Sequence, residues 1–169
     1  QNNFLGTGNR VSVGLNRSEV RNSYNLSFLD PYFTPEGISR GYNIYLRQTK
    51  LDNLNISNYA TDSLGANISF SYPIDETETI SFSAGIDQTK INLGVNPSEA
   101  VYKFTNENGN NVMTYTGTAS WGRNTLNRGT FPTAGASQSV AMEMGLPGSD
   151  ISFYKLTYNA QRYFPVRNE

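Results

Sequence analysis

Few residues of this 169-residue chain could carry catalysis, because it contains neither histidine nor cysteine. Their absence excludes Ser-His and Cys-His nucleophile pairs, thiolate metal sites, the usual zinc sites and the usual general base near neutral pH. Two candidates remain: the glycine-containing segment Gly6-Thr7-Gly8, and the carboxylates Asp75, Glu76 and Glu78. On this basis we expect no enzyme, no metal site and no cofactor.

Both candidates have a simpler structural interpretation. Gly6-Thr7-Gly8 lacks the third glycine of the dinucleotide fingerprint, since Val11 takes its place, and no Lys-Ser/Thr pair or helical pattern follows. We therefore expect a β-strand that is weakened by glycine. The carboxylates lie in a polar turn without an apolar pocket to shift a pKa, which predicts solvated turn residues. Asn-x-Ser sequons begin at Asn16, Asn25, Asn55 and Asn67, and those at Asn25 and Asn67 fall inside predicted strands, a poor context for glycosylation.

The charge balance argues against nucleic acid as a partner. The chain has 13 basic and 14 acidic residues, so it carries no positive excess for phosphates. Charged residues make up only 16% of the chain, against about 25% in a typical soluble domain. Such a composition suits a β-protein with a neutral polar face, or one whose other face does not meet water.

Apolar and polar residues alternate along eight segments, the pattern of β-strands with one apolar face. The segments are residues 11–15, 24–28, 42–46, 64–72, 80–86, 113–121, 140–146 and 154–160. No segment shows a convincing helical stripe, and glycines inside several segments argue against helix. We therefore predict an all-β chain of eight antiparallel strands.

The connections between these segments are of two kinds. Residues 30–37, 73–77 and 128–135 are compact, whereas 16–22, 49–62 and 91–111 are longer and polar, with 147–150 as a short exception on that side. This asymmetry is typical of outer-membrane β-barrels, which have short periplasmic turns. Aromatic residues near strand ends, where a girdle would meet the bilayer interface, are Tyr32, Phe33, Tyr72, Phe131 and Phe164. The pattern favours an antiparallel transmembrane β-barrel; a soluble sandwich or lipocalin-like barrel is the alternative.

Five segments carry a family resemblance. They are QNNFLGTG at 1–8, LSFLDPYFT with EG at 26–37, SNY at 57–59, LNRGTFPTAG at 126–135 and LPGSD at 146–150. Their order and spacing resemble the barrel of the BamA family of outer-membrane protein assembly factors. The segments DPYFT and RGxFPxxG are the most specific of them, and the resemblance covers the whole chain.

The resemblance implies periplasmic POTRA domains followed by a sixteen-stranded barrel. Residues 1–169 would then be a partial barrel domain with strands 1–8, without the POTRA domains and the C-terminal barrel half. It also implies assembly and insertion of β-barrel proteins into the bacterial outer membrane. The implied partners are client outer-membrane proteins, accessory lipoproteins and outer-membrane lipid.

The first strand has a special role in that family. It pairs poorly with the last strand and opens as a lateral gate, whose free backbone groups template a strand of the client. By resemblance, the backbone that binds the client strand is that of Phe4, Leu5, Gly6, Thr7, Gly8, Asn9, Arg10, Val11, Val13 and Leu15.

Residues 128–135 are expected at a periplasmic turn. This turn motif consists of Arg128, Gly129, Phe131, Pro132 and Gly135. Two interpretations stay open: a rigid turn that fixes the sixth and seventh strands, or a contact surface for periplasmic assembly partners. The family's acidic residue before Arg-Gly is replaced by Asn127, so a charge contact there does not carry over.

Two other functions fit the strand pattern. An autonomous eight-stranded outer-membrane barrel could act as an anchor or adhesin, since eight strands close a small barrel. Against it, the chain ends PVRNE, whereas such barrels generally end with an aromatic on the last strand. A soluble ligand-binding β-barrel would need the apolar face inside.

Overall fold

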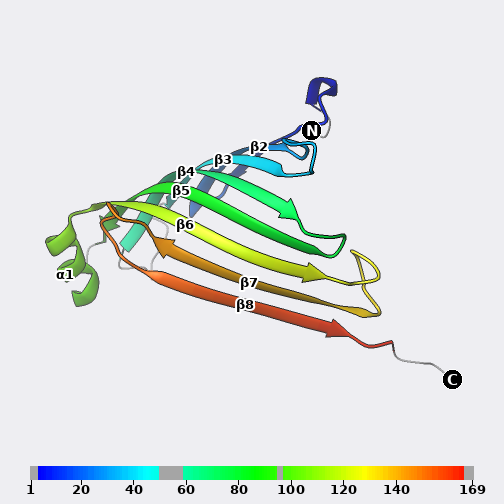
Figure 1. Cartoon of the computed structure of the whole chain (residues 1–169). Coiled ribbons are helices and arrows are strands. Elements are labelled where there is room, and N and C mark those ends of the chain that lie inside the picture. The colour runs from blue at the N-terminus through cyan, green and yellow to red at the C-terminus, as the bar shows by residue number, and fades with distance from the viewer. Residues whose placement is uncertain (1–3, 50–58, 95–96, 166–169) are drawn as a thin grey trace.

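The computed structural model describes residues 4–49, 59–94 and 97–165. Within them, eight strands form one antiparallel sheet in sequential order (Figure 1). The strands are β1 (Arg10–Arg17), β2 (Arg21–Asp30), β3 (Ser39–Thr49), β4 (Tyr59–Pro73), β5 (Glu78–Leu93), β6 (Asn111–Asn124), β7 (Gly135–Gly145) and β8 (Tyr154–Tyr163). The predicted eight-stranded, all-β architecture is confirmed. Asn55 and residues 57–58, singled out above, lie outside the described residues.

The register of the ladders aligns the apolar positions of all the strands. Residues that oppose each other directly in a ladder point to the same side of a sheet. One such row consists of Val13, Leu26, Ile44, Ala66, Ile86 and Tyr115. The neighbouring row consists of Ser12, Ser27, Asn43, Asn67, Gly85 and Thr116. The sheet therefore has one continuous apolar face and one polar face.

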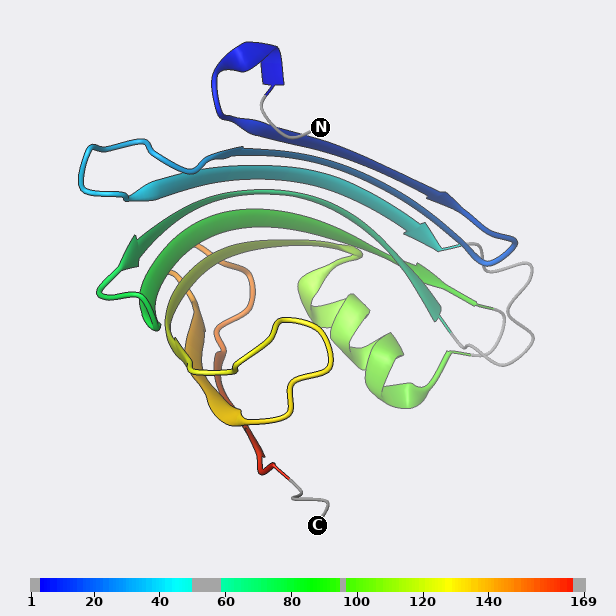
Figure 2. The same ribbon diagram turned by 90° about the vertical axis from the view of Figure 1, so that its right-hand side faces the viewer.

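The sheet curves into an arc (Figure 2). Polar side chains from β3 to β7 line one hollow of about 460 Å³, which identifies the polar face as the concave one. On the other face Val13, Phe82 and Leu156 expose 66, 59 and 70% of their surface. Among the described residues only Ala60 and Val112 are buried apolar residues. The wall thus lacks a packed core and needs apolar surroundings outside, which contradicts a soluble barrel with its apolar face inside.

The two ends of the sheet differ in their connections. The turns 31–38, 74–77 and 125–134 lie at the end where the described chain also begins and finishes (Figure 1). The connection between β5 and β6 lies at the other end, as expected for the long polar loops. We refer to the first end as the turn end.

The long connection contains a helix, α1 (Glu99–Asn108), although the sequence indicated no helical stripe. Its residues Val101 and Phe104 are half-buried and Thr105 is buried, while Tyr102 is 57% exposed. A stripe this narrow is too weak to identify a helix by its period. Neither helix in the described part of the chain is long and apolar enough to cross a membrane.

Candidate functional site

The first candidate site is the outer edge of β1. Among the described residues β1 forms a ladder with β2 alone, from Arg10 opposite Leu29 to Arg17 opposite Asn22. It has eight residues, fewer than its neighbour β2 with ten and half as many as β5 with 16. No ladder joins it to β8 within the described ranges, so the eight strands form an open sheet. Such an edge can accept the backbone of another strand.

The segment before β1 is a compact turn, not the strand that the sequence predicted from Phe4 onward. Phe4 begins the short 3-10 turn η1 (Phe4–Gly6), and its N–H donates to the Asn9 carbonyl at 2.7 Å. Gly6 and Gly8 have φ of 76° and 79°, values that a strand does not accommodate. The Thr7 hydroxyl closes the turn by donating to the Phe4 carbonyl at 2.6 Å. In this structure the extended edge therefore begins at Arg10.

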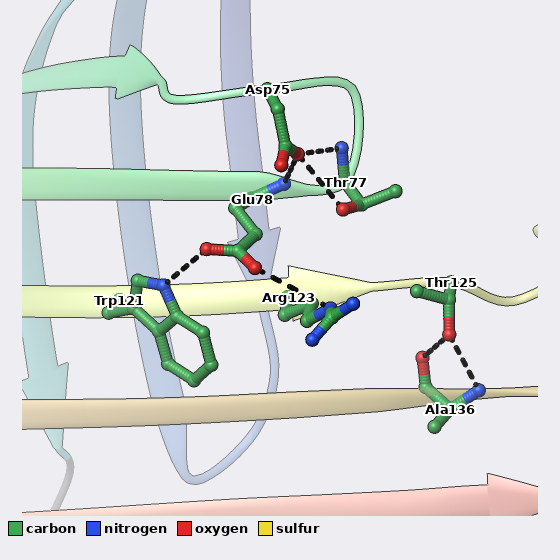
Figure 3. Close-up of polar contacts among 7 residues, drawn as sticks. All are labelled: Asp75, Thr77, Glu78, Trp121, Arg123, Thr125 and Ala136. Carbon is green, nitrogen blue, oxygen red and sulfur yellow. Dashed lines mark hydrogen bonds and ion pairs between the residues drawn. The ribbon is translucent and has the colours of Figure 1, made fainter.

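The second candidate site is the turn between β6 and β7, which is held from both sides by side chains. Thr125 Oγ1 donates to the Ala136 carbonyl at 3.0 Å and accepts the Ala136 N–H at 3.1 Å (Figure 3). Asn127 Oδ1 accepts the N–H groups of Thr133 and Ala134 at 3.1 and 3.2 Å. Its Nδ2 donates to Thr133 Oγ1 at 2.9 Å. A neutral amide thus organises the turn without the acidic residue of the family.

The predicted turn motif lies at the tip of this turn. Phe131 is 87% exposed and has φ of 53°, an unusual conformation for an aromatic residue. Arg128 and Gly129 are exposed beside it. Gly135 ends the turn with φ of 106°, and a Cβ there would lie 2.3 Å from the Thr125 carbonyl oxygen. The structure therefore gathers the motif into one turn, hydrogen-bonded at its base, that presents an aromatic side chain.

A neighbouring turn is organised by Asp75. Its Oδ1 accepts the Thr77 N–H at 2.6 Å, the Thr77 hydroxyl at 2.9 Å and the Glu78 N–H at 2.8 Å (Figure 3). The N–H of Thr77, followed by its hydroxyl, stabilises the charged carboxylate and lowers the pKa of Asp75 below its ordinary value. This carboxylate therefore closes the turn between β4 and β5 by accepting hydrogen bonds within it.

Glu78 differs from the solvated turn residue that the sequence predicted. Its Oε2 accepts the indole N–H of Trp121 at 3.3 Å, and its Oε1 lies 3.5 Å from Arg123 Nε (Figure 3). All three side chains are on the convex face at the turn end, by the register of β5 with β6. A carboxylate at the first position of a strand gives no signal of this pairing in the sequence, because its partners lie more than 40 residues away. The described residues contain no cluster of three metal-ligating side chains.

Comparisons with known proteins agree with this architecture. The family model of the Omp85 superfamily domain matches residues 3–169. The outer membrane protein assembly factor BamA of Neisseria meningitidis serogroup B is 31% identical over 176 residues, which is 98% of this chain and 22% of that protein. The crystal structure of BamA from Haemophilus ducreyi lacking POTRA domains 1–3 superimposes with a TM-score of 0.86 at 28% identity, over 99% of this chain and 34% of the other.

The chain thus spans about a fifth of the Neisseria protein and a third of the Haemophilus chain. Within that span the likeness includes the sequence as well as the fold. The convex apolar face, the short turns at one end and the sequential antiparallel strands are those of a barrel wall in the outer membrane. The chain belongs to the Omp85 superfamily, and its eight strands form part of an outer-membrane β-barrel.

Proposed function

We propose that this barrel wall takes part in the assembly and insertion of β-barrel proteins into the bacterial outer membrane. The observation that carries the proposal is the short edge strand β1, which forms a ladder with β2 alone among the described residues. The Neisseria meningitidis protein that the chain resembles is an outer membrane protein assembly factor by name. We further propose that the eight strands are the first half of a larger barrel with preceding periplasmic domains.

The proposed mechanism uses the backbone and no covalent chemistry. A client strand that pairs with β1 satisfies its main-chain N–H and C=O groups before it is closed into its own barrel. The exposed side chains of Val13 and Leu15 lie on the convex face, and Ser12 and Gly14 lie on the concave one. A client strand with the same alternation would continue both faces. Affinity comes from the main chain, and the side chains set the register.

Cysteine crosslinking tests this proposal, because the chain itself contains no cysteine. Single cysteines at Ser12 and Asn16 in the full chain are combined with a cysteine in the terminal strand of a stalled client. The matched control is Asn43, which lies in the same concave row as Ser12 but on β3, between two paired neighbours. We expect disulfides from β1 and none from Asn43. Equal yields at all three positions, or none on β1, would contradict templating at this edge.

We also propose that the turn between β6 and β7 is a contact for accessory lipoproteins. The exposed Phe131 ring supports this, because it lies in a turn whose two arms are already joined by the hydrogen bonds of Asn127. Contact with a partner would therefore need to order little additional chain. The Phe131→Ala variant should lose co-purification of such partners. Tyr32→Ala is the control, since Tyr32 is 78% exposed in the turn between β2 and β3 at the same end. Retained partners in the first variant, or equal loss in both, would reject this contact.

A further inference from the structure

The convex face of β3 carries a charged pair at the turn end. Arg40 Nη2 lies 3.6 Å from Asp30 Oδ2 on β2, and their side chains are 28 and 20% exposed. The Arg40 guanidinium lies 3.9 Å from the ring centroid of Phe33 and 5.5 Å from that of Tyr42. The register places Arg40 opposite Phe70, which belongs to the apolar face. A cation is therefore fixed among aromatic rings at the border of the membrane-facing surface.

The guanidinium has fewer acceptors than it can use. An Arg side chain has five N–H donors, and the 3.6 Å contact with Asp30 exceeds the usual N–H···O range of about 2.7–3.2 Å. The Nε atom is enclosed and has no hydrogen-bond partner. Asp30 already accepts the Tyr32 N–H on Oδ1 at 3.3 Å. Because polar groups away from water are normally satisfied, this site lacks an acceptor.

An apolar furrow begins at one of these aromatic residues. Tyr42 forms its border, and Ala66 and Ala84 provide the small side chains between the larger Ile68 and Ile86. The furrow has a volume of about 560 Å³ and is lined by apolar surface. It crosses β3, β4 and β5 on the convex face, so it is open toward the hydrocarbon of the bilayer.

We propose that this face binds one zwitterionic glycerophospholipid, of the phosphatidylethanolamine class. The phosphodiester lies at the exposed part of the Arg40 side chain and accepts hydrogen bonds from its guanidinium. The ammonium lies at Asp30, and an acyl chain follows the furrow past Tyr42. The site faces the leaflet on the side of the short turns. The inference depends on the membrane placement of the wall and is independent of templating at β1, so each proposal can fail alone.

The charges favour this headgroup over other phosphates. An anionic headgroup without an ammonium group would place its phosphate close to the Asp30 carboxylate, and the two negative charges would repel each other. Free phosphate leaves the furrow empty and gains nothing from the apolar lining. Only a ligand with a phosphodiester, a cationic group and a chain satisfies all three parts of the site.

Native mass spectrometry of the full chain in detergent tests the site. Phosphatidylethanolamine and phosphatidylglycerol with identical acyl chains are titrated in parallel, and inorganic phosphate is added as a competitor. The variants are R40Q, D30N and A84F, the last of which fills the furrow without touching a charge. R123Q is the matched control, because Arg123 is also on the convex face at the turn end but is paired with Glu78. Heat-modified gel mobility checks that each variant is folded.

We expect one retained phosphatidylethanolamine, with roughly tenfold weaker binding in R40Q and A84F and unchanged binding in R123Q. D30N should weaken phosphatidylethanolamine binding and strengthen phosphatidylglycerol binding, because the carboxylate that repels the phosphate of the anionic lipid is gone. Displacement by inorganic phosphate, equal retention of both lipids by the unmodified chain, or unchanged retention in folded A84F would each overturn the proposal. If R40Q does not fold, A84F and D30N decide the outcome.

Discussion

Tyr45 on β3 reaches across the intervening strand β4 to donate a 2.5 Å hydrogen bond to Asp87 on β5. The strand between them has Gly65 at this position, directly opposite both residues in the two ladders. A Cβ at Gly65 would fall 2.5 Å from the Tyr45 ring, so the glycine leaves the space in which the ring lies. The contact ties three strands together on the concave face.

Gly65→Ala should therefore displace the Tyr45 ring and break its bond to Asp87. We expect a loss of about 1–2 kcal/mol in the free energy of unfolding, measured by urea titration of the full chain in lipid. Gly14→Ala is the control, since a Cβ there meets Asn25 only at an ordinary 3.6 Å. In a Tyr45→Phe background the same alanine should cost less. Equal effects of both alanines would contradict this explanation.

Asn127→Ala should loosen the turn between β6 and β7. It removes the acceptor for the Thr133 and Ala134 N–H groups, with a loss of roughly 1–2 kcal/mol. Asn127→Asp should be nearly neutral, because a carboxylate accepts the same two N–H groups and the Thr133 hydroxyl. Hydrogen exchange at the two amides measures the effect. Faster exchange in the aspartate variant than in the alanine variant would exclude this role.

Asp75 should make stability depend on pH at the acid end. Its pKa is lowered in the folded chain, so its contribution is fully present above the unfolded pKa of about 3.9 and is lost as pH falls through the folded value. Asp75→Asn removes this titration. The difference in urea midpoint between the two proteins should be largest at neutral pH and shrink below about pH 4. A difference that stays constant down to the acid end would contradict the assignment.

Replacing Glu78 should disturb the surroundings of Trp121 on the convex face more than replacing Arg123. Glu78→Ala removes the partner of both Trp121 and Arg123, whereas Arg123→Ala removes one ion pair whose Arg side chain is 55% exposed. Trp121 is the only tryptophan of the chain, so its fluorescence reports on this site. We expect an emission shift in Glu78→Ala and little change in Glu78→Gln, whose amide oxygen still accepts the indole N–H. The same shift in Arg123→Ala would refute the ranking.

The sequence was sufficient to predict the strands of the sheet and their two faces. It was insufficient to predict the turn before β1 and the helix between β5 and β6. Alternation with period two assigned Ile44 and Asn43 to opposite faces, because a strand's side chains point alternately to its two sides. The turn before β1 was missed because Gly6 and Gly8 are compatible with a weak strand as well as with positive φ. Helix α1 was missed because an isolated ten-residue helix has little intrinsic stability, and its sequence carries a weak signal.

The candidate sites also differ in how far the sequence predicted them. The motif at residues 128–135 was located by its sequence, since all of its members lie in one turn. The contacts of Glu78 with Trp121 and of Tyr45 with Asp87 depend on the register between strands, which single-sequence periodicity does not give. Asn127 was noted only as a departure from the family, although its amide organises the turn.

Across the ladders, apolar residues lie opposite apolar residues and polar residues opposite polar ones. The connections between the strands therefore differ in how well they tolerate inserted residues. One residue added to the tight turn at Asp75 that shifts the pairing of β4 with β5 by one position would turn Phe82 toward the polar concave face. The same residue, or an entire inserted domain, placed near Gly109 would lengthen an exposed loop and leave the ladders in place. For epitope tags and display fusions, the connection that carries α1 is therefore the permissive site, and the turn at Asp75 is a forbidden one.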